Sequence, residues 1–180
     1  MVLQRDRSGL LILDVQERLT STMSDPRRVL QNCGLLMRAA RRLGVPIVVT
    51  EQDPQSLGPT MVDLRPYLPE DGALPKVHFS AAADPAILAR LKGLGRDQLV
   101  IAGIETHIGV VQTALDLQAK GLQPMVVADA CASRHIESEQ MAWSRLRQCG
   151  VQLLSFEMAL FEWLGEAGTP EFKELSPLVR

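Results

Sequence analysis

The sequence has no long apolar run and no excess of either charge. Its longest apolar stretches, such as residues 10–13 and 45–49, are the length of strands, whereas a helix that crosses a bilayer needs about 20 apolar residues. The 19 Lys and Arg residues nearly balance the 21 Asp and Glu residues, which gives a net charge of −2. Dedicated nucleic-acid binders usually carry a basic stripe and a high pI. We therefore expect no membrane role and no nucleic-acid partner.

Cysteine and histidine are also scarce. None of the three cysteines lies in a Cys-x-x-Cys pair, and residues 1–8 contain no apolar signal region. This pattern is typical of a reduced, cytoplasmic protein. The three histidines are scattered, without the spacing of a zinc site. We predict no metal and no cofactor.

Short apolar runs alternate with longer helical stretches along the chain. Its 180 residues are the length of one domain, and 46% hydrophobic with 22% charged residues is ordinary globular composition. Strands are expected at residues 9–14, 45–50, 77–79, 98–103, 124–128 and 151–154. Helices are expected at residues 26–43, 85–91, 106–120, 138–149, 156–164 and 170–178. This order predicts an α/β fold: a three-layer αβα, Rossmann-like single domain over residues 1–180, with a mainly parallel six-stranded sheet.

Three features lie at the ends of expected strands, and open parallel sheets bind ligands outside the carboxyl ends of their strands. Asp14 follows the first apolar run, and it either caps the next turn or serves as an acid whose pKa is raised by burial. Lys76 lies among Pro, Val and Phe residues, and it is either a solvated surface charge or a buried amine paired with Asp14. Gly109 lies in a strand-to-helix turn, where it either exposes amides to an anion or lets the helix approach the sheet closely.

These features belong to segments that together resemble one protein family. The segments are LLILDVQERL, TEQDPQSLGPT, PKVHFSA, IAGIETHIGVVQTALDL and VVADACASR. In order and spacing, from about Gly9 to the C-terminus, they resemble the isochorismatase-like hydrolase superfamily, also called the cysteine hydrolases. The resemblance is closest to the isochorismatase domain-containing branch. It implies a small-molecule substrate and, because relatives commonly form dimers or larger assemblies, a homo-oligomer.

The resemblance also places the catalytic Asp, Lys and Cys of that family on three positions of this chain. The Asp falls on Asp14 and the Lys on Lys76, but the Cys falls on Gly109. The family further implies a cis peptide bond between Ile104 and Glu105, and an oxyanion site formed by the amides of Glu105 and Gly109.

The missing thiol excludes one of the two reactions known for this family. A glycine cannot attack a carbonyl carbon, so the amidase route through a thiolate is closed. The sequence His-Ile-Gly at this turn resembles the true isochorismatases, which hydrolyse a vinyl ether with an acid and a water molecule. By that resemblance Asp14 is the acid, and Lys76 orients it and stabilises charge. The alternative is a catalytically silent relative that serves as a ligand-binding or oligomeric scaffold protein.

Four further residues are candidates for contact with the substrate: Gln16, Gln52, Phe79 and His107. Each has a plainer alternative, since the two glutamines could be solvated, the phenylalanine could belong to the core and the histidine could be a structural hydrogen-bonding residue. Arg134, which follows the fifth expected strand, is expected to be structural or to form a subunit contact.

Overall fold

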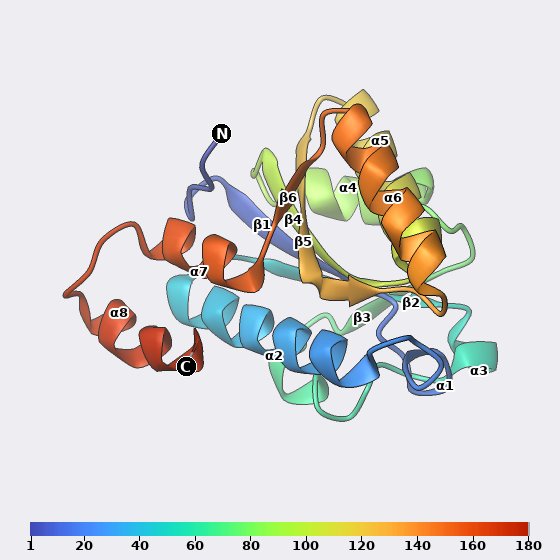
Figure 1. Cartoon of the computed structure of the whole chain (residues 1–180), viewed down its shortest axis with the longest axis horizontal. Helices are drawn as coiled ribbons and strands as arrows, with labels where there is room; N and C mark the ends of the chain where they lie inside the picture. The colour runs from blue at the N-terminus through green and yellow to red at the C-terminus, as the bar shows by residue number, and fades with distance from the viewer. Residues whose placement is uncertain (180) are drawn as a thin grey trace.

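The computed structural model describes residues 1–179, and its centre is a six-stranded parallel sheet (Figure 1). The strands are β1 (Ser8–Leu13), β2 (Ile47–Gln52), β3 (Ala73–Lys76), β4 (Gln98–Ile104), β5 (Gln123–Ala132) and β6 (Gln152–Leu154). Their order in space is β3-β2-β1-β4-β5-β6, and each neighbouring pair is parallel. The strand order therefore reverses between β1 and β4.

Helices cover both faces of the sheet (Figure 1). One face carries α2 (Pro26–Leu43), α7 (Phe156–Leu164) and α8 (Pro170–Leu175). The other face carries α4 (Pro85–Lys92), α5 (Val111–Ala119) and α6 (Ile136–Gln148). Two single-turn helices, α1 (Glu17–Thr20) and α3 (Pro54–Leu57), follow β1 and β2. The predicted three-layer α/β architecture with a six-stranded parallel sheet is confirmed.

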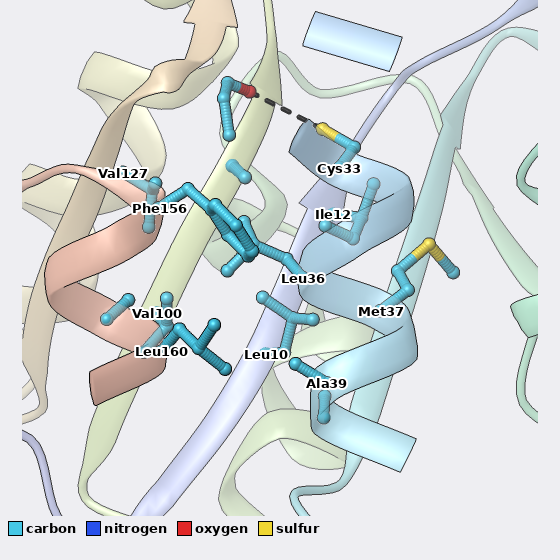
Figure 2. Close-up of a cluster of buried hydrophobic side chains, with 14 of the residues drawn as sticks. Leu10, Ile12, Cys33, Leu36, Met37, Ala39, Val100, Val127, Phe156 and Leu160 are labelled. Carbon is cyan, nitrogen blue, oxygen red and sulfur yellow. Dashed lines mark hydrogen bonds between the residues drawn. The ribbon is translucent and has the colours of Figure 1, made fainter. Parts of the chain in front are cut away.

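The central strand β1 contributes to two separate hydrophobic cores. Leu10 and Ile12 belong to the core under α2 and α7, whereas Leu11 and Leu13 belong to the core under α4, α5 and α6. Figure 2 shows the first core, in which Leu10 and Ile12 lie beside Leu36 of α2. Each fully buried leucine contributes about 1.5–3 kcal/mol. Burial on both faces explains why the apolar run of β1 does not alternate with polar residues.

The third strand lies earlier in the chain than the sequence predicts. It spans Ala73–Lys76 rather than residues 77–79, and it pairs with β2 so that Lys76 lies opposite Gln52. Val77 and Phe79 follow the strand and are 75% and 57% exposed. Because β3 is a half-buried edge strand that contains a proline, its apolar signal is weak. The correction puts Lys76 at the carboxyl end of a strand.

The connections differ from expectation in three further places. The predicted helix at 106–120 begins with a π-helical turn, Thr106–Val110, and becomes regular only in α5. The strand β5 continues past residue 128 to Ala132, with a register irregularity against β4. The aperiodic stretch 51–73 contains α3 and a 3-10 turn, Arg65–Tyr67.

Candidate active site

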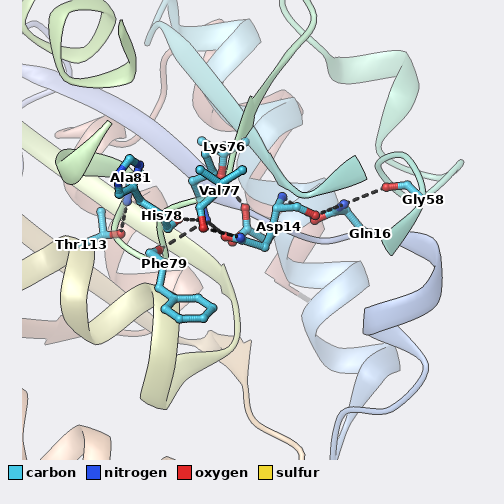
Figure 3. Close-up of polar contacts among 11 residues, drawn as sticks. Asp14, Gln16, Gly58, Lys76, Val77, His78, Phe79, Ala81 and Thr113 are labelled. Carbon is cyan, nitrogen blue, oxygen red and sulfur yellow. Dashed lines mark hydrogen bonds and ion pairs between the residues drawn. The ribbon is translucent and has the colours of Figure 1, made fainter. Parts of the chain in front are cut away.

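The three residues that the sequence analysis placed at strand ends lie near the reversal of strand order. Asp14 directly follows β1, Lys76 ends β3 and Gly109 lies in the turn after β4. In Figure 3 the side chains of Asp14 and Lys76 point toward each other, although 62 positions separate them in the sequence. This edge of a parallel sheet is where open α/β folds bind ligands.

Asp14 and Lys76 form a buried ion pair. The Lys76 Nζ atom donates to Asp14 Oδ2 at 2.7 Å, and the two side chains are 5% and 0% exposed for Asp14 and Lys76 respectively. The alternative of Lys76 as a solvated surface charge is therefore wrong. Removing one partner of a buried pair costs about 3–5 kcal/mol, because the other charge stays buried without compensation.

The remaining contacts of Lys76 hold its ammonium group in place. Nζ also donates to Gln52 Oε1 at 2.7 Å, to the His78 carbonyl oxygen at 3.1 Å and to the Phe79 carbonyl oxygen at 3.3 Å. The segment that supplies these carbonyls is anchored to α5, since the Ala81 amide donates to Thr113 Oγ1 at 2.9 Å (Figure 3). An ammonium group has three hydrogens, so these oxygens together with Asp14 Oδ2 leave it no free donor.

Asp14 is held by the neighbouring strand as well as by the lysine. Its backbone adopts a left-handed conformation with φ of 55°, and its amide donates to the Thr50 carbonyl at 3.1 Å. The Thr50 hydroxyl donates to Asp14 Oδ1 at 2.7 Å. Both carboxyl oxygens therefore have a donor, one from β2 and one from β3.

Burial raises the pKa of Asp14 above its ordinary value. The Lys76 ammonium and the Thr50 hydroxyl act in the opposite direction, because both stabilise the charged carboxylate. The nearby Glu51 carboxylate raises the pKa further through like-charge repulsion. The net direction is upward, so the protonated acid is easier to reach than for a carboxyl in water.

Gly109 leaves open the position at which the resemblance puts a cysteine. A Cβ atom there would lie 3.6 Å from Asp14 Oδ2, 3.4 Å from the Phe79 carbonyl oxygen and 3.6 Å from that of Ile104. These are ordinary van der Waals contacts, so the position faces Asp14 and has room for a side chain. The peptide bond between Ile104 and Glu105 is cis, as the resemblance implies.

A cavity of about 350 Å³ opens beside Asp14 and Gly109. Its lining residues are Asp14, Leu19, Gln52, Leu57, Phe79, Ile104, Glu105, Ile108, Gly109 and Arg134. The volume is within the range of small-molecule sites, and the mixture of apolar wall and few polar groups is typical of them.

Two of the four predicted substrate contacts line this cavity and two do not. Gln52 and Phe79 are among the lining residues. Gln16 is fully buried, and its amide donates to the carbonyls of Gln52 and Gly58 and accepts from the Gln52 amide. His107 lines a separate pocket of about 170 Å³, and its Nδ1 lies 2.9 Å from Ser133 Oγ. Gln16 thus connects the loops around the site, and His107 faces a pocket other than this cavity.

Two polar residues of the site were missed by sequence reasoning. Thr50 contacts Asp14 directly, and a polar residue at the end of a buried strand was the available signal. Arg134 lines the cavity and pairs with Glu105, although the sequence analysis gave it a structural or subunit role. Only the fold brings the end of β5 to the turn after β4.

Neither a metal-binding cluster nor a membrane-spanning helix is found in the part of the chain that the structure describes. Among residues 1–179, no three His, Cys, Asp or Glu side chains lie close enough together to hold a metal ion. No helix within the same residues is both long and apolar enough to cross a bilayer. The expected lack of a metal and of a cofactor stays a prediction.

The fold and the buried pair define an α/β protein with a carboxyl–amine site at the reversal point of its sheet. A family model, the isochorismatase domain, matches residues 8–158. Isochorismatase domain-containing protein 2 of Bos taurus is 39% identical over 176 residues, which cover 96% of this chain and 83% of the relative. The chain belongs to the isochorismatase family.

Solved structures share the fold of this chain. The MAR1 ribonuclease from Caenorhabditis elegans superposes with a TM-score of 0.92 at 32% identity, over 99% of this chain and 92% of that chain. The YcaC gene product of Escherichia coli, described as an octameric hydrolase of unknown specificity, has a TM-score of 0.92 at 23% identity. That match covers 99% of this chain and 90% of the YcaC chain and shows a likeness of fold.

Proposed function

We propose that this protein hydrolyses a small vinyl ether without a covalent nucleophile, with Asp14 as the acid and Lys76 as the charge stabiliser. The observation that carries the proposal is the buried Asp14–Lys76 pair, at 2.7 Å, beside a glycine at the family's cysteine position. A vinyl ether needs an acid and a water molecule for hydrolysis, so the missing thiol is no obstacle.

The reaction begins with Asp14 in its protonated form. Its carboxyl proton moves to the terminal vinyl carbon, a new C–H bond forms, and the adjacent carbon becomes an oxocarbenium centre. Water adds to that centre and returns a proton to the Asp14 carboxylate. The C–O bond of the resulting hemiketal then breaks, the hydroxyl proton of the hemiketal passes to the leaving oxygen, and pyruvate and an alcohol are released. The acid is regenerated and no co-reactant besides water is used.

Lys76 acts at the moment when Asp14 loses its proton. The carboxylate that forms lies 2.7 Å from an ammonium group, and the ion pair stabilises this charged form. The three other oxygens around Nζ keep the amine fixed, so little reorganisation accompanies the transfer. Before the substrate reacts, Asp14 must be protonated. Burial favours this state because it raises the pKa of the Asp14 carboxyl.

Other residues of the cavity have supporting roles in this proposal. The amides of Glu105 and Gly109 are the predicted donors to the leaving oxygen when the C–O bond of the hemiketal breaks, since negative charge develops on oxygen at that step. Gln52 and Phe79 are the predicted side-chain contacts of the substrate, since both line the cavity beside Asp14.

The direct experiment is to incubate the purified protein with isochorismate and to quantify pyruvate. Release of pyruvate and of the dihydroxylated ring product in equal amounts, above the uncatalysed rate, is expected. A protein that leaves isochorismate unchanged would contradict the proposal.

A silent scaffold is the second candidate, and the glycine at position 109 is the observation that favours it. Gly109→Cys restores the side chain of the family's nucleophile in a position that has room for it. Amide hydrolysis that appears in this variant, with no hydrolysis of isochorismate by the natural protein, would identify a former amidase. The vinyl-ether proposal expects the natural protein to be active.

The setting of this activity is also part of the proposal. We expect a cytoplasmic homo-oligomer that acts on a small molecule and does not bind nucleic acid. Size-exclusion chromatography with light scattering measures the oligomeric state. A monomer at micromolar concentration would contradict this expectation.

A further inference from the structure

Arg134 brings a positive charge into the cavity that the proposed mechanism does not use. It lies two residues after β5, lines the cavity with Asp14 and Gly109, and its side chain is 51% exposed. Among the lining residues that the structure describes, Arg134 is the one that carries a positive charge. Lys76 cannot take this role, because four protein oxygens surround its ammonium group.

Glu105 fixes one edge of the Arg134 guanidinium. Its Oε2 atom accepts from Arg134 Nε at 3.0 Å and from the Arg134 amide at 3.1 Å, and the Glu105 side chain is buried. Within residues 1–179, the structure gives the two terminal Nη nitrogens of Arg134 no hydrogen-bond acceptor. The guanidinium is therefore held on its Nε side, and its Nη donors are free. A planar fork of this kind matches the two oxygens of a carboxylate.

The rest of the cavity wall is largely apolar. Leu19, Leu57, Phe79 and Ile108 line it together with Ile104. A ligand that fills about 350 Å³ and contacts both this wall and the guanidinium would have an apolar body and at least one anionic group.

We propose that Arg134, positioned by Glu105, binds a carboxylate of the substrate, and that the substrate is a small carboxylate with an apolar or ring-shaped body. The inference rests on the proposed function in one respect: the carboxylate is then the one carried by the vinyl-ether unit that becomes pyruvate. Arg134 holds that unit so that its vinyl carbon faces Asp14.

Benzoate and its neutral analogue benzamide test this inference by binding alone. Both have an apolar ring of suitable size, and they differ in charge. Isothermal titration calorimetry on the natural protein should give a benzoate Kd at least tenfold below the benzamide Kd. Arg134→Met keeps the unbranched stem of the side chain to about the Nε position and removes the guanidinium, so it should weaken benzoate binding at least tenfold and leave benzamide binding unchanged.

Two further arginine variants, one at position 145 and one at position 134, make the test more specific. Arg145→Met is the matched control, since this exposed arginine lines the separate pocket beside His107, and it should bind benzoate as the natural protein does. Arg134→Lys keeps the charge but loses the fork, and a severalfold loss of benzoate affinity is expected. If Arg134→Met does not fold, the lysine variant carries the test.

The positioning role of Glu105 is tested by the same pair of ligands. Glu105→Gln keeps an oxygen that can accept from Arg134, so it should retain the preference for benzoate. Glu105→Met removes that acceptor and should lower the benzoate preference while benzamide binding persists.

The outcomes separate this inference from the proposed function. Equal loss of both ligands in Arg134→Met, unchanged benzoate binding, or no benzoate binding by the natural protein would each overturn it. Isochorismate turnover that is indifferent to Arg134→Met would leave the proposed function standing without it. A benzoate preference that depends on Arg134, in a protein that does not turn over isochorismate, would keep the carboxylate site and reject the reaction.

Discussion

The pKa of Asp14 is the residue property on which the proposed chemistry depends most. Burial raises it, whereas Lys76 and Thr50 lower it by stabilising the carboxylate. A group that must donate a proton loses activity as the pH rises through its pKa. The rate of vinyl-ether hydrolysis should therefore be highest at low pH and fall as the Asp14 carboxyl ionises.

Thr50→Val tests this pH dependence. The substitution removes the hydroxyl that donates to Asp14 Oδ1 and so destabilises the carboxylate, which raises the pKa of Asp14. The falling limb of kcat/KM against pH should move to higher pH. Thr22→Val, at an exposed position, is the control and should leave the limb in place. A shift of the Thr50→Val limb to lower pH would contradict the role of Asp14 as the acid.

Gly109→Cys tests whether the empty position accepts a side chain. Its Cβ would have neighbours at 3.4–3.6 Å, so the unfolding free energy should change by less than about 2 kcal/mol. Burial raises the pKa of Cys33 and Cys131, which makes both thiols unreactive, whereas Cys149 is exposed. In a Cys149→Ser background, mass spectrometry after iodoacetamide treatment should therefore find the label at position 109 alone. A folded Gly109→Cys protein without label at this position would show that the position is not open to the cavity.

Charged residues at the ends of apolar strands could be found from the sequence, because burial makes them exceptional. Asp14 has this signal, Lys76 stands out as a charge among Pro, Val and Phe residues, and the structure brings the two together. The roles of Gln16 and Arg134 could not be judged in the same way. Gln16 bonds to the carbonyl of Gly58, 42 positions away in the sequence. Arg134 lines the cavity because it contacts Glu105, which follows a different strand.

At the scale of the elements, the close approach of β1 and β4 depends on one glycine. Gly103 has φ of 118°, and a Cβ atom there would lie 2.1 Å from the Leu13 carbonyl oxygen. Leu13 directly precedes Asp14, so this approach also sets the position of the acid. No side chain can be accommodated without moving one of the two strands.

Gly103→Ala should therefore destabilise the protein by more than about 4 kcal/mol or prevent folding. Gly109→Ala is the matched control, since the same methyl group there meets only ordinary contacts and should cost much less. Urea unfolding followed by circular dichroism measures both. Equal stability of the two variants would mean that β1 and β4 are not packed as described.

The central strands β1, β2 and β4 could be predicted closely, whereas the edge strand β3 could not. The runs that became β1, β2 and β4 are continuous and apolar, which is the pattern of a covered parallel sheet. The edge strand β3 has mixed burial and contains Pro75, so the sequence analysis placed it too late in the chain. The π-helical turn after β4 has no composition that distinguishes it from the start of an α-helix.

At the scale of the whole molecule, the topology explains how distant residues form one site. The chain places β2 and β3 on one side of β1 and β4 to β6 on the other, so the polar ends of strands from both halves meet at the reversal point (Figure 1). The acid, the amine and the glycine turn come from these different strands. Strand order of this kind is set by right-handed βαβ connections, which is why the fold class could be predicted from the alternation of elements.

The most direct test of nucleophile-free hydrolysis is the rate of pyruvate release from isochorismate by Asp14→Asn beside that of the natural protein. The asparagine keeps the shape of the side chain and can still bond to Thr50 and Lys76, so the protein should stay folded at a cost of about 3–5 kcal/mol, because the Lys76 charge loses its counter-charge. Thermal unfolding checks that both proteins are folded at the assay temperature. The account predicts pyruvate release by the natural protein and only the uncatalysed rate for Asp14→Asn. Equal rates for the two folded proteins would contradict it.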